Sequence, residues 1–444
     1  DEPGPAGRVG RLRARLLARG DLRSYEAFET ARRGVRSLQA RRAALSRQVG
    51  RGRRAVRRRR LERGYRRSLR RPIDPDLAVF AAYWYSGYAC NPRAIYEKAC
   101  ELVPGMRAVW VVQPGGAAAL PAGVEHVVAG TPEYFDVLAR ARYFVNNVNF
   151  PNHLVKRPGS VHVMTHHGTP LKRMGMDLRD TLVAGRKMDF DALLRRCERW
   201  DFSVSSNPLS TLVWERVYPT RHETLETGYP RNDALVRATA ADVARIRAEL
   251  GIEPGRTAVL YAPTHREWRS GYVPTLDVGA VAEALGPDHV LLARLHYFYG
   301  ADPLIRELHA AGRILDVAEH PSIEELSLAA DVLVTDYSSL MFDYAVLDRP
   351  IVIHAPDWEV YRAMRGTYFD LMEEPPGVVA RTDGEVVDAL LSGDAAGPAA
   401  ERHRAAFRER FCPWDDGRAA ERVVRRVWLG ERASAAAPTR AGVR

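Results

Sequence analysis

The feature that most constrains the fold is a regular alternation of short apolar runs with helix-length amphipathic segments. In the first half of the chain, strands are predicted at 77–83, 107–112, 124–128, 143–147, 161–165 and 202–205, and helices at 92–102, 132–141 and 179–200. This order is typical of βαβ units, in which helices cover both faces of a parallel sheet. An α/β fold class follows.

The same alternation starts again after Gly228-Tyr229-Pro230. Here strands are predicted at 258–262, 290–295, 313–317, 332–335 and 351–354, and helices at 241–250, 278–285, 323–329 and 340–347. Two open sheets in tandem predict two Rossmann-like domains that face each other across a cleft. Ligands of open α/β sheets bind beyond the carboxyl ends of the strands. We therefore expect the functional residues in the loops that follow strands.

Charge divides the chain further. Residues 1–75 hold 24 Arg and 7 acidic residues, a net charge of +17, so the rest of the chain carries −6 of the total of +11. Pro72 and Pro75 mark the end of this basic segment. The predicted organisation is a basic helical extension at 1–75, Rossmann-like domains at 76–235 and 236–432, and a disordered tail at 433–444.

The basic extension suits an anionic membrane surface, where each Arg contributes about 1 kcal/mol of attraction. A solvated linker helix to an upstream domain is the main alternative. Nucleic acid is less favoured, because no aromatic residues interleave with the Arg run to stack on bases. Apolar stretches are far shorter than the roughly 20 residues of a membrane span, and no signal peptide is recognised. We expect a cytoplasmic protein that lies at the inner face of the membrane.

Four cysteines, Cys90, Cys100, Cys197 and Cys412, are scattered without metal-ligand or disulfide spacing. The loop at 165–172 carries more chemistry, because it reads Thr-His-His-Gly-Thr-Pro-Leu-Lys directly after a strand. An imidazole is well suited to remove a hydroxyl proton near neutral pH, and Lys172 could meet a phosphate oxygen. The same residues are also consistent with a His-rich turn that caps strand and helix ends.

Three loops of the second half could bind phosphate. Arg294 and His296 are predicted to point to the same side of a strand. There they could clamp an anion, or they could simply form a solvated edge face. Asp336, Ser338 and Ser339 lead into a predicted helix, whose start attracts phosphate or is simply capped by serine. Thr264 and Arg266 follow another strand, although an Arg–Glu surface pair explains those charges equally well.

Taken together, these residues resemble the CDP-glycerol glycerophosphotransferase family, the teichoic-acid primases and polymerases. The matching segments, which span about residues 79–370, are NPRAIY at 91–96, HGTPLK at 167–172, GYPRND at 228–233, YAPT at 261–264, TDYSSLMFDYAVLDRPIV at 335–352 and RGTYFD at 365–370. Each segment alone is a weak signal, but their common order is specific. His166, His265 and Tyr297 depart from residues that the family commonly has there. The change at His166 leaves open which imidazole acts, and the other two lie in the predicted donor domain, so the polyol could differ.

The resemblance implies a GT-B-like fold, a CDP-linked polyol phosphate donor and no metal or other cofactor. It places a catalytic histidine at His167, a second one at His296 and the donor diphosphate at Ser338 and Ser339. The first domain then takes the acceptor and the second the CDP donor. On this basis the predicted site residues are Gly168, Thr169 and Lys172 on the acceptor side, and Thr264, Arg266, Arg294, Asp336, Ser338 and Ser339 on the donor side.

The predicted reaction transfers glycerol phosphate or a related polyol phosphate from CDP-glycerol or a similar donor. His167 would act as general base on a hydroxyl of a polymer, saccharide or lipid-linked acceptor, and CMP would leave. The predicted partners are that donor, that acceptor and an anionic membrane surface, with no specific nucleic acid. Two alternatives stay open: a GT-B glycosyltransferase with a nucleotide-sugar donor, and an inactive binding module driven by the basic extension.

Overall fold

A computed structural model of the chain describes residues 30, 56–181, 188–266, 275–295 and 303–431. The chain divides into two compact units, residues 1–70 and 71–444. In the first unit, residues 56–68 form a helix on which Arg57, Arg58, Arg59 and Arg60 are exposed. Most of the predicted extension and the whole predicted tail at 433–444 lie outside the described residues. Among the described helices, none is both long and apolar enough to cross a membrane.

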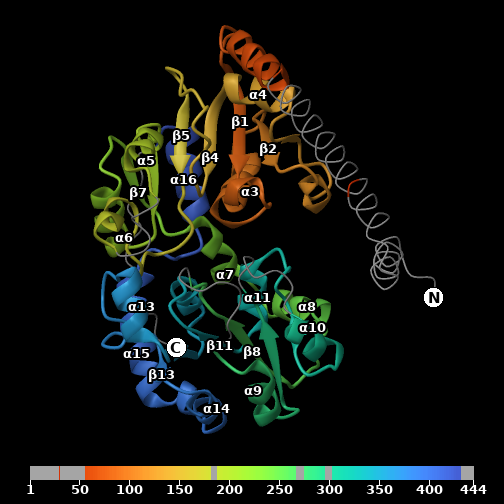
Figure 1. The fold of residues 1–444 in the computed structure, drawn as a ribbon, viewed down its shortest axis with the longest axis vertical. Coiled ribbons are helices and arrows are strands. Elements are labelled where there is room, and N and C mark those ends of the chain that lie inside the picture. The colour runs from red at the N-terminus through yellow and green to blue at the C-terminus, as the bar shows by residue number, and fades with distance from the viewer. Residues whose placement is uncertain (1–29, 31–55, 182–187, 267–274, 296–302, 432–444) are drawn as a thin grey trace, which may run out of the picture. The chain divides into compact units, whose positions relative to one another are not determined.

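The first of two sheets in the larger unit has the strand order β3-β2-β1-β4-β5-β6-β7 (Figure 1). Every neighbouring pair is parallel. Its strands are β1 (Asp74–Ala81), β2 (Arg107–Val112), β3 (His126–Val128), β4 (Ala141–Asn146), β5 (Val161–Met164), β6 (Phe202–Ser205) and β7 (Glu223–Glu226). The connecting helices are α3 (Cys90–Leu102), α4 (Pro132–Arg140), α5 (Phe190–Cys197) and α6 (Pro208–Val217). Residues 77–81 of β1 are all buried, as expected of a strand covered on both faces.

The second sheet has the order β10-β9-β8-β11-β12-β13 and is also parallel throughout. Its strands are β8 (Thr257–Ala262), β9 (His289–Ala293), β10 (Leu315–Asp316), β11 (Val332–Thr335), β12 (Ile351–His354) and β13 (Val378–Ala380). The helices before and around it are α7 (Asp233–Arg237), α8 (Ala240–Glu249), α9 (Val278–Leu285), α10 (Pro303–Ala310), α11 (Ile323–Ala329), α12 (Leu340–Tyr344), α13 (Trp358–Arg365), α14 (Asp383–Leu391) and α15 (Pro398–Phe411).

The strand order reverses at one point in each sheet. In the first sheet the chain moves outward on one side from β1 and on the other from β4, and β8 and β11 play the same parts in the second sheet. Ligands of open α/β sheets bind at such switch points, beyond the carboxyl ends of the two strands. The two α/β sheets confirm the predicted fold class and place two candidate binding regions.

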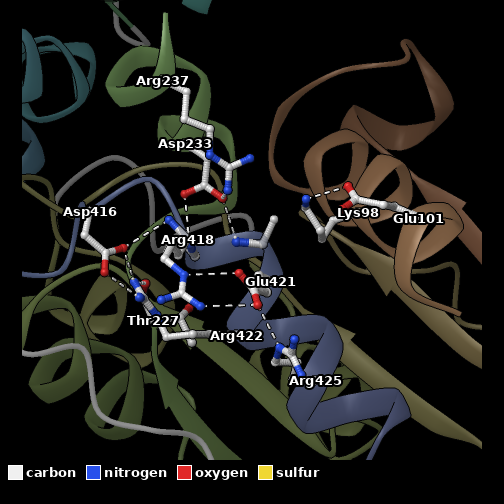
Figure 2. A network of polar contacts seen from close by, with 12 residues as sticks. Lys98, Glu101, Thr227, Asp233, Arg237, Asp416, Arg418, Glu421, Arg422 and Arg425 are labelled. Atoms are coloured by element: carbon white, nitrogen blue, oxygen red, sulfur yellow. Dashed lines mark hydrogen bonds and ion pairs between the residues drawn. The ribbon is translucent and has the colours of Figure 1, made fainter.

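The last helix, α16 (Ala419–Trp428), packs on the first sheet rather than the second. Val423 and Val424 belong to the first sheet's hydrophobic core, and the helix lies among that sheet's elements in Figure 1. Figure 2 shows what anchors it: the Asp233 carboxylate accepts the main-chain N–H groups of Ala419 and Ala420, at 2.8 and 2.9 Å. Residues 419–428 therefore complete the first sheet's core, although the predicted domain boundaries grouped them with the second.

The long helix predicted at 179–200 is absent as one element. A 3-10 helix, η3 (Gly175–Asp180), precedes α5, and residues 182–187 between them lie outside the described part. Asp189 has an extended backbone, and its carboxylate accepts the N–H of Ala192 at 2.8 Å. This N-cap starts a new helix at Phe190, so a single helix cannot run through Asp189.

Candidate functional site

A cavity of about 680 Å³ lies at the switch point of the first sheet. Loops that follow β1, β2, β4 and β5 form most of its wall, as expected for a ligand site in a parallel sheet. Ser339, at the start of α12 beyond the second sheet, also lines it. The described lining residues include Trp84, Gln113, Asn147, Asn149, Asn152, His167, Gly168, Thr169, Lys172, Arg196 and Ser339, and none of the described lining residues carries a carboxylate.

His167 stands at this cavity with its ring held in one tautomer. Its Nδ1 lies 3.0 Å from the main-chain carbonyl oxygen of Asn147. Because a carbonyl can only accept, Nδ1 carries the proton and Nε2 keeps its lone pair. The ring is accessible from the cavity, but surrounding protein atoms desolvate it and lower its pKa, an effect to which Arg231 and Lys172 add and which the Asn147 carbonyl opposes. His167 is therefore arranged as a neutral base.

His166 is placed quite differently, although the two residues are neighbours. Its ring stacks on Trp214 with centroids 4.2 Å apart, and its Nε2 lies 3.0 Å from the Ser203 hydroxyl. The residue is only 6% exposed, and burial lowers its pKa well below the ordinary value. Its φ of 50° turns the chain sharply at the end of β5, so that the two rings separate. His166 thus packs as an aromatic core residue.

A strained turn forms the opposite wall. Tyr83, Trp84 and Tyr85 make up the 3-10 turn η1 (Tyr83–Tyr85), and all three have positive φ, of 44°, 54° and 74°. Such a backbone costs roughly 1–2 kcal/mol for each residue other than glycine. Hydrogen bonds hold it: the Asn147 side chain accepts the Tyr83 N–H at 2.9 Å, and the Gln113 amide donates to the Trp84 carbonyl at 2.7 Å.

The turn brings one aromatic ring against His167 and another to the cavity wall. The Tyr83 ring meets the His167 ring edge-on, with centroids 5.9 Å apart. Trp84 lines the cavity and remains 57% exposed. Strained backbone that is held by its surroundings gathers at functional sites, and this turn fits that pattern. Sequence reasoning missed it, since nothing in the run Ala82-Tyr83-Trp84-Tyr85 signals a positive φ.

The predicted acceptor-side residues lie on the same loop but serve different purposes. The Thr169 hydroxyl is buried between Ser206 and Asn207, at 2.9 Å from the hydroxyl of the one and the amide nitrogen of the other. Lys172 lines the cavity and forms an antiparallel bridge with Thr367. Gly168 lies so close to Ser339 that a Cβ at position 168 would be 2.5 Å from the Ser339 hydroxyl oxygen. Gly168 is therefore the point where the two halves of the site meet.

The second switch point holds a buried ion-pair cluster. The Asp336 carboxylate accepts the Thr264 N–H at 2.8 Å and thereby ties the loop after β8 to the loop after β11. The Arg266 guanidinium donates to Asp336 at 2.8 Å and to both oxygens of Asp357 at 2.9 and 3.0 Å. It is 2% exposed on its side chain and lies against the rings of Tyr337 and Tyr361. Arg266 thus faces carboxylates within the protein.

The remaining donor-side predictions fall nearby or outside the described chain. Ser339 precedes α12 and lines the cavity, and the Ser338 hydroxyl accepts the Leu340 N–H at 3.3 Å. Arg294 follows β9, where its guanidinium donates to the carbonyls of Val317 and His320 at 2.7 and 2.5 Å. His296 lies outside the described residues. β9 ends at Ala293, so Arg294 lies just beyond the strand.

A second missed feature joins the halves below the cavity. Arg231 and Asp343 form a buried ion pair with a 2.5 Å contact, and side-chain exposures are 6% and 7%. The Arg231 main-chain N–H donates to the Asn91 side chain, which also donates to the carbonyls of Thr165 and His166. Both residues belong to motifs recognised in the sequence, GYPRND and TDYSSLMFDY. Their pairing was not predictable, because it depends on contacts between segments more than a hundred positions apart.

Groups of His, Cys, Asp and Glu that could hold a metal ion are absent from the described part of the chain.

Comparison with known proteins places this geometry in a family. The family described as CDP-Glycerol:Poly(glycerophosphate) glycerophosphotransferase matches residues 64–429. The teichoic acid glycerol-phosphate transferase of Staphylococcus aureus is 32% identical over 368 residues, which cover 80% of this chain and 93% of that protein. The teichoic acid poly(glycerol phosphate) polymerase of Bacillus subtilis is 31% identical over 376 residues, 82% of this chain, and the aligned part spans 50% of that relative's length.

Solved structures agree. The wall teichoic acid polymerase TagF matches with a TM-score of 0.71 and 30% identity, over 79% of this chain and 88% of that one. A TagF variant soaked with CDPG matches with a TM-score of 0.72 and 29% identity over the same shares. These findings confirm the predicted family resemblance and the α/β fold with two parallel sheets.

Proposed function

Because the chain belongs to the CDP-glycerol:poly(glycerophosphate) glycerophosphotransferase family, we propose that it transfers glycerol phosphate from CDP-glycerol to a hydroxyl group of a teichoic-acid-like acceptor. Family membership makes the chain a transferase, and glycerol phosphate transfer from a CDP-linked donor in teichoic acid synthesis is the family's reaction. The chain spans half the length of its Bacillus subtilis relative, so the activity of the whole protein is part of the proposal.

One observation carries the assignment of the chemical step. His167 has its Nδ1 fixed by a carbonyl, its Nε2 unprotonated and its pKa lowered by desolvation, at a cavity that Ser339 also lines. A base for a hydroxyl group needs this state near neutral pH. In the proposed step, an oxygen of the acceptor hydroxyl attacks the glycerol-bearing phosphorus. Its proton passes to Nε2 of His167, and the bond to CMP breaks.

On the donor side, Ser338 and Ser339 offer hydroxyl groups to the phosphates, and Lys172 supplies a cation at the cavity. We retain His296 as a phosphate-facing residue on the basis of the family resemblance, and Arg294 on the basis of its place directly after β9. Arg266 and Asp336 take another role, because their buried ion pair fixes the loops that carry Thr264 and Ser338. They are positioning residues. Preorganised positioning and electrostatics supply most of the acceleration in phosphoryl transfer.

The test compares CMP release from CDP-glycerol by the wild-type chain, His167→Asn and the matched control His403→Asn, whose histidine is exposed on α15. Loss of a general base costs about 10²- to 10⁴-fold in turnover. We expect that loss for His167→Asn with the donor dissociation constant nearly unchanged, and no change for the control. A His167→Asn enzyme that keeps its turnover would exclude the assignment. Release of a nucleoside diphosphate from a nucleotide sugar would instead identify a glycosyltransferase.

We further propose that the protein works at the inner membrane face through its basic first unit. Support comes from the helix at 56–68, on which four consecutive Arg residues, Arg57–Arg60, are exposed. Cosedimentation of the full chain with vesicles tests this. Binding to anionic vesicles that weakens as salt rises is expected, since exposed charges are screened within about 10 Å at 0.1 M salt. Equal binding to neutral vesicles, or binding to RNA alone, would contradict it.

A further inference from the structure

Asn147 holds a buried polar group that the fold leaves unpaired. The residue is 1% exposed and lines the cavity. Its Oδ1 accepts the Tyr83 N–H at 2.9 Å, and because an N–H can only donate, this bond fixes which end of the amide is oxygen. Its Nδ2 then has no hydrogen-bond partner among the described residues. An unpaired buried donor is costly and calls for an explanation, such as a ligand.

The position of this donor suggests which ligand. The main-chain carbonyl of Asn147 is the group that orients His167, so one residue of the cavity wall both sets the base and carries the unpaired amide N–H. A hydroxyl group can donate one hydrogen bond and accept others. A hydroxyl that gives its proton to Nε2 of His167 can therefore accept from Nδ2 of Asn147 through its oxygen.

Trp84 supplies the apolar part of such a site. Its ring is 57% exposed where it lines the cavity, and Gln113 and the strained turn hold its backbone in place. Amide side chains also line the cavity, and the cations among the described lining residues are Lys172 and Arg196, the latter donating to Asn152 at 3.1 Å. An exposed indole beside several amides suits a neutral, hydroxyl-rich group, whose C–H face packs on the ring while its hydroxyls bond to the amides.

We propose that Asn147 binds the attacking hydroxyl of the acceptor through Nδ2, and that Trp84 is the wall against which the polyol or sugar end of the acceptor lies. This inference rests on the proposed function and names the residues that select the acceptor. In the step itself the hydroxyl oxygen bonds to the donor phosphorus, its proton goes to His167, and CMP departs with the electrons of the broken P–O bond. Asn147 neither gains nor loses a proton in this step.

The experiment uses the full chain with CDP-glycerol as donor and octyl glycerol phosphate as acceptor. Asn147→Asp keeps the oxygen that accepts from Tyr83 but replaces the Nδ2 donor. We expect kcat/KM for the acceptor to fall about 10- to 100-fold, with the donor Kd changed less than about threefold. His403→Asp, which adds the same charge at an exposed position on α15 that does not line the cavity, is the control. Profiles from about pH 6 to 9 separate any shift in His167 from lost acceptor binding.

Trp84 gives an independent readout, because its exposure makes substitution harmless to the core. Trp84→Ala should raise the acceptor KM about tenfold with little change in kcat, and Trp84→Phe should restore it, since the aromatic face is retained. The two Trp84 variants still test the proposal if Asn147→Asp does not fold.

Several results would overturn the inference. One is an Asn147→Asp enzyme with wild-type kcat/KM for the acceptor, and another is a loss of donor affinity in parallel with activity, which a structural role would produce. A Trp84→Ala enzyme with unchanged KM counts equally against it. A wild-type chain that releases no CMP from CDP-glycerol overturns the proposed function as well, so the two failures are distinguishable.

Discussion

The contact between Gly168 and Ser339 makes Gly168→Ala the sharpest test of how the two sheets meet. An added Cβ would lie 2.5 Å from Oγ and 2.8 Å from Cβ of Ser339. The Ser339 hydroxyl can rotate away, but its Cβ moves only with the backbone. Gly168 is not among the glycines with positive φ, so its backbone conformation can be adopted by alanine without strain. The perturbation therefore acts only through the distance between the two loops.

The magnitude follows from that distance. Ordinary van der Waals contact begins at 3.4 Å, so the Ser339 Cβ must withdraw by about 0.6 Å, the difference between 3.4 and 2.8 Å. A displacement on the order of 1 Å at a reacting centre can cost about 10²-fold in rate. Overpacking also destabilises a fold by about 1–3 kcal/mol. We expect kcat/KM to fall by about 30- to 100-fold in Gly168→Ala, with the chain still folded.

The assay is CMP release by four enzymes: wild type, Gly168→Ala, Ser339→Gly and the double variant. Ser339→Gly removes both clashing atoms, so the double variant should be no worse than Ser339→Gly alone, which is a large coupling between the two positions. Gly384→Ala is the control, because its nearest neighbour would be 3.9 Å away. The reasoning fails if Gly168→Ala stays within threefold of wild type, or if the two single losses multiply in the double variant.

Three further predictions concern buried charges. Because desolvation lowers the pKa of His167 below its ordinary value of 6.5, kcat/KM should stay level above neutral pH and fall only as the pH drops below that value and the ring is protonated. Arg266→Met leaves two carboxylates without their cation and should cost about 3–5 kcal/mol in urea unfolding, whereas Arg245→Met, which breaks an exposed helix pair, should cost far less. Burial raises the pKa of Asp415 from 3.8 to about 7, so the folded state binds its proton more tightly than the unfolded state. The free energy of unfolding should therefore fall as the pH rises from about 4 to 7, and Asp415→Asn should flatten that slope.

Each of these has an outcome that contradicts it. A rate profile with a midpoint above 6.5 would mean that another group is titrated. Equal stability losses in the two arginine variants would mean that the buried cluster is no more important than a surface pair. A pH slope that persists in Asp415→Asn would have to come from other groups.

The sequence predicted the parts of this protein that depend on local pattern. The strands at 107–112, 202–205, 332–335 and 351–354 and the helices at 278–285 and 323–329 have the predicted bounds. A parallel strand buried on both faces is continuously apolar, so its pattern does not depend on its neighbours. The loops after strands were likewise found, because motif residues at 167–172 and 335–339 stand directly behind apolar runs.

Local pattern could not reveal which of those residues face each other. Two adjacent histidines look alike in sequence, yet His166 stacks on Trp214 in the core and His167 faces the cavity. The sequence predicts Arg266 as a phosphate ligand, but carboxylates of Asp336 and Asp357, from distant loops, pair with it. Asn147 attracted no notice at all, because its importance lies in one unpaired nitrogen atom.

By itself, then, the sequence determined the α/β alternation, most strands of the two sheets and the family of the chain, since periodicity and motifs are properties of neighbouring residues. It did not predict the edge strands β7 and β13 or the helices α13 to α16. Only the tertiary structure decided which loops of the two sheets meet, the return of α16 to the first sheet and the tautomer of His167. Each of these depends on hydrogen bonds or packing between residues far apart in the chain. Such contacts form only once both sheets have folded, so no local signal encodes them.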